Sequence, residues 1–221
     1  MEPFQSMTVK ELSDQIGGLS NPGKMPGHGW GISADLCNVG TSLQNVKGSI
    51  CFDCYAMKGR YRMPNVVEAH KRRIDLYRLG PWRWSKAMAE LINRKKLTLF
   101  RWFDSGDLQD VTMLAYIVSI ACDCPNTTFW LPTREARILD QYVTAWGNQW
   151  PVNLTIRLSS ISVDDLPRAS IADRLNVMTS TVTTSKDKAT CPATTSSDKT
   201  CKAHGCTACW QKGFNISYLK H

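Results

Sequence analysis

Two groups of cysteines have the residue type and spacing of metal ligands. Seven of the nine cysteines belong to them, and each group ends in C-x2-C, which lets two thiolates bind one metal centre from a single turn. The N-terminal thiol set comprises Cys37, Cys51 and Cys54, in the pattern C-x13-C-x2-C. The C-terminal thiol set comprises Cys191, Cys201, Cys206 and Cys209, in the pattern C-x9-C-x4-C-x2-C.

The thiol sets predict an iron–sulfur cluster of the 4Fe–4S type, with zinc as the alternative, because thiolate ligands select both. Four cysteines would complete a tetrahedral zinc site or hold a cluster. Three cysteines on a cluster would leave one iron open to a substrate or cofactor. If a cysteine of the C-terminal thiol set supplied the fourth ligand, both sets would build a single centre. The sequence does not decide between one metal centre and two. Disulfides are the weaker interpretation, because residues 1–19 contain no apolar secretion signal.

Length and composition predict one soluble globular domain of 221 residues, with 43% hydrophobic and 21% charged residues. Its most apolar stretch, residues 113–122, is too short to cross a bilayer, so we expect no membrane partner. Within the domain we expect an irregular lead-in over 1–27, a core of βα units over 28–182, and a Cys-rich segment with a final strand over 183–221. Residues 183–209 hold few large apolar side chains, so a metal would have to order them.

The positive charge is concentrated in one block. Residues 58–101 carry 13 Lys and Arg against 3 Asp and Glu, whereas the whole chain has a net charge of +8. Such a block predicts binding to nucleic acid or to a small anionic molecule, and a solvated helix surface is the alternative.

Apolar periodicity predicts the elements that must position these residues. Helices are expected near 9–16, around 66–77, from 81 to about 92, around 111–122, and from the polar turn at 132–135 to about 146. Residues 38–49 are expected to form a loop. The expected strands are 28–33, 97–103, 127–131, 154–158, 175–180 and 214–219. Strand, polar turn and helix alternate, which indicates an α/β fold of parallel βα units in a partial TIM-like barrel. Among the cysteines outside the sets, Cys122 is expected in the core and Cys124 in a turn, with a C-x-C ligand pair as the alternative.

In parallel βα folds the loops after the strands form the active site. The candidate catalytic residues in these loops are Asp104, Asp107, Arg134 and Glu135. Arg157 and Ser159 are the candidates for cofactor or substrate binding, because arginine grips anionic groups with two parallel hydrogen bonds. Ser105, Thr133 and Ser160 occupy the same turns.

The run from Gly48 to Tyr61, GSICFDCYAMKGRY, resembles the CxxCYAxKGxY segment of a family of phage proteins labelled gene product 88. Residues 100–107, 131–135 and 191–210 also match, as does a Y-x-x-H ending at Tyr218 and His221. The resemblance extends from about residue 24 to 221. It implies a phage source and the cytoplasm of an infected bacterium, and it implies no mechanism. Phe103 stands where the family pattern has His.

A more distant similarity is to radical S-adenosylmethionine enzymes, which pair a βα-barrel with a cluster held by three cysteines. This chain lacks their C-x3-C-x2-C spacing, so the similarity is at the level of the fold.

Three functions compete. The favoured one is an iron–sulfur protein in redox or radical chemistry, acting on a small anionic substrate or with an electron-transfer partner. The second is a zinc-stabilised phage protein that binds or processes nucleic acid through residues 58–101, with magnesium bound by the acidic turn residues. The aromatic residues interleaved in that block are Tyr61, Tyr77, Trp82 and Trp84. The third is a non-enzymatic module that binds a host factor.

Overall fold

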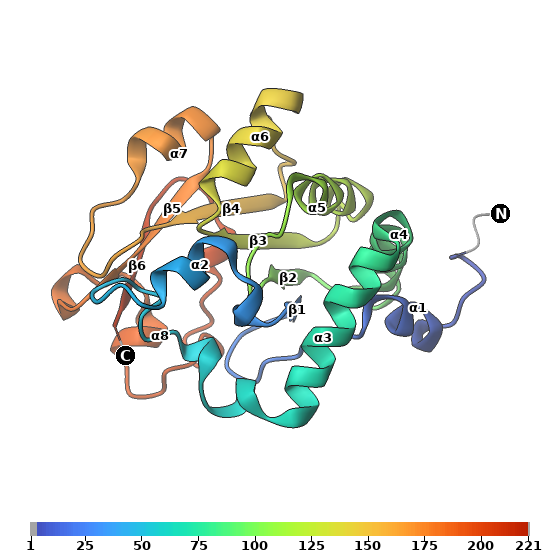
Figure 1. The fold of residues 1–221 in the computed structure, drawn as a ribbon, viewed down its shortest axis with the longest axis horizontal. Coiled ribbons are helices and arrows are strands. Elements are labelled where there is room, and N and C mark those ends of the chain that lie inside the picture. Colours follow the sequence, from blue (N-terminus) through green and yellow to red (C-terminus); the bar gives the residue numbers. More distant parts are fainter. Residues whose placement is uncertain (1–3, 221) are drawn as a thin grey trace.

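Six parallel strands form one sheet in which the strand order in space is the order in the chain (Figure 1). A computed structural model describes residues 4–220. The strands are β1 (His28–Trp30), β2 (Leu99–Trp102), β3 (Thr128–Thr133), β4 (Leu154–Ser159), β5 (Met178–Thr183) and β6 (Ile216–Leu219). Sequential parallel strands curl into a barrel wall, and six of them make a half-barrel. The predicted α/β class and partial barrel are confirmed.

The helices connect and cover these strands. They are α1 (Val9–Ile16), α2 (Asn38–Leu43), α3 (Pro64–Leu79), α4 (Pro81–Arg94), α5 (Val111–Asp123), α6 (Ala136–Trp146), α7 (Ala169–Leu175) and α8 (Pro192–Thr195). Sequence signals fix several boundaries: Thr8 and Glu11 form a capping box at α1, and Asp110 caps α5 by accepting a hydrogen bond from the Met113 amide at 2.7 Å.

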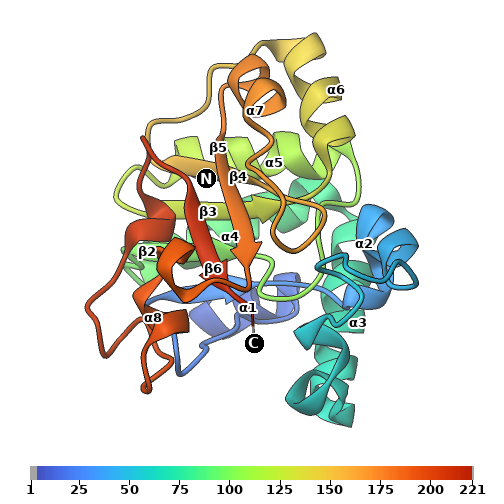
Figure 2. The same ribbon diagram turned by 90° about the vertical axis from the view of Figure 1, so that its left-hand side faces the viewer.

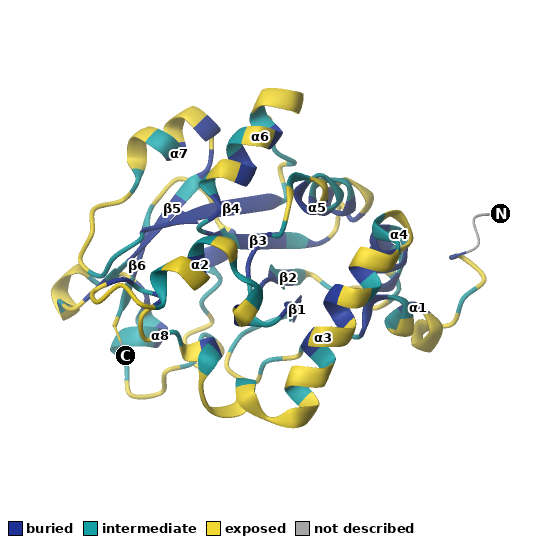
Figure 3. Cartoon of the chain, viewed as in Figure 1, coloured by how far each residue is buried: buried dark blue, intermediate teal, exposed yellow. Residues whose placement is uncertain are grey.

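Successive side chains along each strand point to opposite faces of the sheet. Phe100 and Trp102 point to the helix-covered face, where α4, α5, α6 and α7 follow the strands in an arc (Figure 1). The buried rings of Trp30 and Trp84 pack edge to face there, with centroids 5.1 Å apart. Figure 3 shows that the strands are the most buried part of the chain.

The opposite, concave face of the sheet is covered by the C-terminal chain. Trp130, Trp210 and Ile216 form a second buried cluster there, and Cys191 and Cys209 belong to it. Figure 2 shows α8 and the C-terminal chain in front of the strands, with α4 and α5 behind them. The Cys-rich segment therefore fills the inside of the half-barrel. In a closed barrel the same space is filled by the side chains of the strands.

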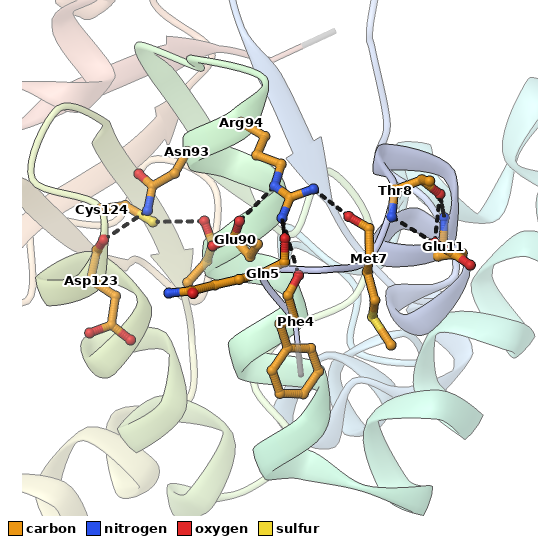
Figure 4. A network of polar contacts seen from close by, with 11 residues as sticks. Phe4, Gln5, Met7, Thr8, Glu11, Glu90, Asn93, Arg94, Asp123 and Cys124 are labelled. Carbon is orange, nitrogen blue, oxygen red and sulfur yellow. Dashed lines mark hydrogen bonds and ion pairs between the residues drawn. The ribbon is translucent and has the colours of Figure 1, made fainter. Parts of the chain in front are cut away.

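Arg94 contacts the first described residues of the N-terminal lead-in. Arg94 of α4 donates to the carbonyl oxygens of Phe4 at 3.2 Å, Gln5 at 2.6 Å and Met7, and to the Glu90 carboxylate at 2.6 Å (Figure 4). Residues 1–3 of the expected lead-in lie outside the described residues. No helix between residues 4 and 220 combines the length and the apolar character needed to cross a bilayer.

Three predicted elements were wrong in part. Residues 38–49 were expected as a loop, but they contain α2, a short helix without apolar periodicity. The expected strand at 175–180 begins too early, because Leu175 ends α7 and Asn176 turns the chain with a φ of 53° before β5. The first strand ends at Trp30 instead of residue 33.

The expectation for Cys122 was wrong and that for Cys124 incomplete. Cys122 is exposed, because the buried stripe of α5 runs through its neighbour Ala121 and leaves residue 122 on the solvent side. Cys124 is the buried thiol, and its Sγ lies 3.5 Å from the carbonyl oxygen of Ala89.

Candidate functional site

The N-terminal thiol set lies at the carboxyl end of the sheet. Cys37 immediately precedes α2, and Cys54 immediately precedes the 3-10 turn Tyr55–Met57. A Cβ placed on Gly40 would lie 2.8 Å from the Cβ of Cys37, 3.5 Å from its Sγ and 3.7 Å from the Sγ of Cys51. Glycine at position 40 therefore leaves the space in which these two sulfurs approach one another.

The charges around this set are close enough to act on the thiols. Burial raises the pKa of Cys37 far above its ordinary value, and Asp107 and the other two thiols raise it further. Burial also raises the pKa of Cys51, while the nearby Arg134 opposes the rise. The neutral thiol is thus favoured by the protein alone, and a bound cation would favour the thiolate.

Two buried carboxyl groups lie at the strand ends: Asp107 joins the loops after β2 and β3, and Glu135 joins the strand ends to α2. Asp107 accepts hydrogen bonds from Thr133 Oγ1 at 2.6 Å and from the Arg134 and Leu108 amides at 2.9 and 2.8 Å. Glu135 accepts one from the Val39 amide at 2.8 Å, at the positive end of α2. Burial, more than the opposing hydrogen bonds, raises the pKa of Asp107, and burial raises that of Glu135 to about 7.

The candidate catalytic residues separate into two places. Asp107, Arg134 and Glu135 gather beside the N-terminal thiol set, where Arg134 Nε also donates to the Ser160 carbonyl oxygen at 3.1 Å.

Asp104 points elsewhere. Its carboxylate lies 3.5 Å from Ser20 Oγ and is close enough to Arg73 and Arg101 to act on both guanidinium charges. Its carbonyl oxygen accepts from the hydroxyl groups of Tyr55 at 2.8 Å and Tyr61 at 3.2 Å. Asp104 therefore lies beside Ser20, Arg73 and the two tyrosines, and no hydrogen bond or ion pair within residues 4–220 joins it to Asp107, Arg134 or Glu135.

The C-terminal thiol set lies on the concave face. Cys191 acts electrostatically on both Cys201 and Cys209, and Cys206 acts on Cys201. The Cys201 amide donates to the Lys24 carbonyl oxygen at 2.8 Å. Cys209 Sγ lies 3.3 Å from the Tyr218 hydroxyl, and burial raises the pKa of Cys209 to about 11 despite that hydrogen bond.

Arg157 of β4 holds this segment in place. Its side chain is fully buried, with 0% exposed, and all its N–H groups donate to backbone carbonyl oxygens. The acceptors are Cys209 at 3.0 Å, Thr179 at 3.1 Å, Phe214 at 2.8 Å, Ala208 at 3.1 Å and Gln211 at 2.5 Å. A cofactor contact through Arg157 would have to replace one of these bonds. The second predicted binding residue, Ser159, pairs its Oγ with Ser180 Oγ at 3.1 Å.

The start of the same segment runs along the outer side of β6. The Thr190 and Cys191 amides donate to the Ser217 carbonyl oxygen at 2.9 and 3.1 Å. The Ser217 amide in turn donates to Thr190 Oγ1 at 2.9 Å, and the Leu219 amide to Thr194 Oγ1 at 3.0 Å. These bonds satisfy backbone groups of β6 that no further strand pairs.

Within residues 4–220, no group of three or more Cys, His, Asp or Glu side chains is already arranged to hold a metal ion. The donor chemistry at each set and the space beside Gly40 nevertheless suit a thiolate-bound centre. His204, between two cysteines of the C-terminal set, hydrogen-bonds Ser196 Oγ at 2.7 Å.

The basic block of residues 58–101 is dispersed over the surface. Lys58 lies near the carboxyl end of the sheet, whereas Lys95 and Lys96 precede β2 at the opposite end. Five of its side chains form the ion pairs Lys58–Asp53, Arg62–Asp35, Lys71–Asp75, Lys86–Asp123 and Arg94–Glu90. Of the interleaved aromatic residues, Tyr77 and Trp84 are buried in the core.

The sequence reasoning missed Arg101 and Tyr218, which line the concave face. Arg101 lies between Phe100 and Trp102, which face the covering helices, so strand alternation alone places it on the opposite, concave face. Its guanidinium carbon lies 4.5 Å from the centre of the Trp130 ring. Tyr218 occupies the corresponding face of β6, beside Cys209.

These features define an α/β half-barrel protein with thiol groups at the carboxyl end of its sheet and on its concave face. The family model described as Gene product 88 matches residues 22–213, so the chain belongs to this family of phage proteins. Neither a curated protein nor a solved structure matches it. The comparisons thus confirm the family resemblance and lend no support to the similarity with radical S-adenosylmethionine enzymes. His221 of the Y-x-x-H ending lies outside the described residues.

Proposed function

We propose that the protein is an iron–sulfur enzyme that carries out redox or radical chemistry in the cytoplasm of the infected bacterium. The observation that carries the proposal is the gathering of Cys37, Cys51 and Cys54 beside Asp107, Arg134 and Glu135. Thiols and ionisable groups meet at the carboxyl end of a parallel sheet, where folds of this architecture place their active sites.

The separation of the two thiol sets favours two centres. Each set interacts within itself, through Cys37, Cys51 and Cys54 in one case and through Cys191 with Cys201 and Cys209 in the other. The N-terminal thiol set would hold the reactive centre, because three thiolates leave a cluster iron without a protein ligand. When bound, such a cluster supplies electron transfer.

The protein groups around that set have separate roles. Asp107 fixes the loops after β2 and β3 through three hydrogen bonds, and so holds Arg134 in place. Glu135, with a pKa of about 7, is suited to accept or return a proton near neutral pH. The C-terminal thiol set would act as a structural staple of the segment that lines the concave face.

Metal and sulfide analysis of anaerobically purified protein tests the proposal. We expect iron with matching acid-labile sulfide and broad absorption near ~400 nm. Cys51→Ala and Cys206→Ala should each remove about half of the metal if there are two centres. Stoichiometric zinc without sulfide would overturn the iron–sulfur assignment, and loss of all metal in both variants would indicate one centre.

The alternative is a zinc-stabilised protein that binds or processes nucleic acid. It is supported by the exposed aromatic rings of Phe52 and Tyr55 near the exposed Lys58 and Arg60. The other basic residues of the 58–101 block are dispersed over the surface, so they do not form a continuous phosphate-binding groove. Retention on DNA that falls steeply with salt would favour this alternative. An unchanged phage phenotype in stable Asp107→Asn and Arg134→Gln variants would instead favour a non-enzymatic module.

A further inference from the structure

Arg101 is a cation on the concave face whose hydrogen-bonding groups have weak partners. Its Nη1 lies 3.1 Å from the Met25 sulfur, and its Nη2 donates to the Tyr55 hydroxyl at 3.2 Å. Its Nε is buried without a hydrogen-bond partner, and none of the ion pairs formed within residues 4–220 contains Arg101. A charge that is withdrawn from water is stabilised by a hydrogen-bonded anion, and the Asp104 carboxylate, which acts on Arg101 without forming an ion pair with it, supplies only part of that stabilisation.

The other arginines near the sheet are used differently. All five N–H groups of the Arg157 guanidinium donate to backbone carbonyl oxygens. Arg73 donates to the Gly18 carbonyl oxygen at 3.1 Å and to Ser20 Oγ at 3.2 Å. Arg101 instead lies over the Trp130 ring, with 4.5 Å between guanidinium carbon and ring centre. The Trp130 Nε1 is a second buried donor without a partner. Two unsatisfied donors therefore lie in one place.

We infer that Arg101, Tyr55 and Trp130 form a binding site for an oxyanion, a carboxylate or phosphoryl group, of a small molecule. The planar fork of a guanidinium matches two oxygen atoms of either group, and stacking on the indole holds the fork in a fixed orientation. The site is open to solvent on one side, because Tyr55 is 56% exposed.

The position of this site connects it to both thiol sets. Tyr55 directly follows Cys54, and the charge of Arg101 acts on Cys201 and Cys209. A ligand anchored at Arg101 would extend toward the carboxyl end of the sheet. As a statement about the substrate of the enzyme, this inference rests on the proposed function; as a statement about anion binding, it holds with or without a metal.

Two groups of the protein compete for the same charge. The Asp104 carboxylate acts on Arg101 from one side, and thiolates of the C-terminal set would act on it from the other. If those thiolates were its true partner, Arg101 would stabilise metal binding and would bind no external anion. The experiment must therefore measure both properties on the same preparations.

Calorimetric titrations with inorganic phosphate and with acetate, at low ionic strength, test the inference. We expect saturable binding of at least one of them, and the stronger of the two identifies the group recognised. Arg101→Gln should weaken it at least about tenfold, the loss expected for charge-assisted hydrogen bonds. Arg174→Gln removes the same charge from an exposed side chain on α7 and should leave the affinity unchanged.

Two further measurements keep the outcomes distinct. Arg101→Lys keeps the charge but not the fork, so it should bind more weakly than the native protein even if Arg101→Gln fails to fold. Metal content is determined for every variant. Absence of saturable binding, or native affinity in a folded Arg101→Gln protein that has lost metal, overturns the inference. Phosphate binding by a colourless, iron-free protein would overturn the proposed function and leave this inference intact.

Discussion

The two thiol sets differ in what surrounds them. The N-terminal thiol set lies among ionisable side chains, Asp107, Arg134 and Glu135, at the carboxyl end of the sheet. The C-terminal thiol set lies among apolar rings and backbone carbonyl oxygens, on a segment that Arg157 holds against the concave face. We therefore propose that the N-terminal thiol set is the reactive one and the C-terminal thiol set the structural one, because their neighbours differ although both end in C-x2-C.

The largest effect is expected from removing the arginine that holds the C-terminal thiol set. Arg157→Ala leaves five buried carbonyl oxygens without their donor, so we expect a loss of at least about 3 kcal/mol in the free energy of unfolding. Urea denaturation measures it. The matched control is Arg174→Ala, which breaks a half-exposed ion pair with Asp140 and should cost under about 1 kcal/mol. Equal losses would contradict the structural role of this set.

Removal of one buried thiol from each set sharpens the comparison further. Cys191 and Cys51 are equally buried, each with 7% exposed, so their replacement by alanine changes packing to a similar extent. Cys191→Ala should lower the free energy of unfolding by at least about 2 kcal/mol more than Cys51→Ala, because only its metal orders a segment. The measurements are metal content and urea denaturation. Equal destabilisation would mean that the two sets share one role.

A smaller and local effect is expected at Gly40. In Gly40→Ala the new methyl group would lie 2.8 Å from the Cys37 Cβ, which forces α2 and the thiols apart. We expect a cost of about 1–3 kcal/mol and loss of metal from the N-terminal thiol set alone. Gly23→Ala, where nothing lies within 4 Å, is the control and should change little. Retention of all metal in Gly40→Ala would show that the thiols do not need this close approach.

The smallest effect concerns pH, through His70 of α3. Burial, followed by the charge of Arg73, lowers the pKa of His70 from its ordinary value of 6.5. The unfolded chain then binds the proton more readily, so the contribution to stability is full above pH ~6.5 and is lost as the pH falls toward the folded pKa. Urea midpoints between pH 8 and 5 should therefore fall more for the native protein than for His70→Gln. Parallel curves would exclude this linkage.

The sequence predicted the fold because strand and helix patterns are local. The apolar stripe of Trp84, Met88 and Leu91 is buried in α4 as expected. The sequence could not predict α2, because this helix has no apolar stripe and its first turn is stabilised by the Glu135 carboxylate, which is distant in the chain.

The acidic and basic turn residues of the candidate site were predictable, because they directly follow the strands, whereas the assignment of the cysteines as metal ligands stays a prediction. The roles of the arginines were not. The acceptors of Arg157 are backbone carbonyl oxygens more than 20 residues away, and backbone groups carry no sequence signature. The position of Arg101 on the concave face was predictable from the alternation of Phe100 and Trp102, but the missing hydrogen-bond partner of its buried Nε was not.

The hydrogen bonds between residues 190–194 and β6 have one more consequence. The last strand of an open sheet exposes a row of amides and carbonyls that can recruit a strand from another chain, and proteins that leave it bare aggregate. Here Thr190, Cys191 and Thr194 occupy that row instead. Because Cys191 belongs both to this cover and to the C-terminal thiol set, the metal proposed at that set would also protect the edge strand, and with it the solubility of the protein.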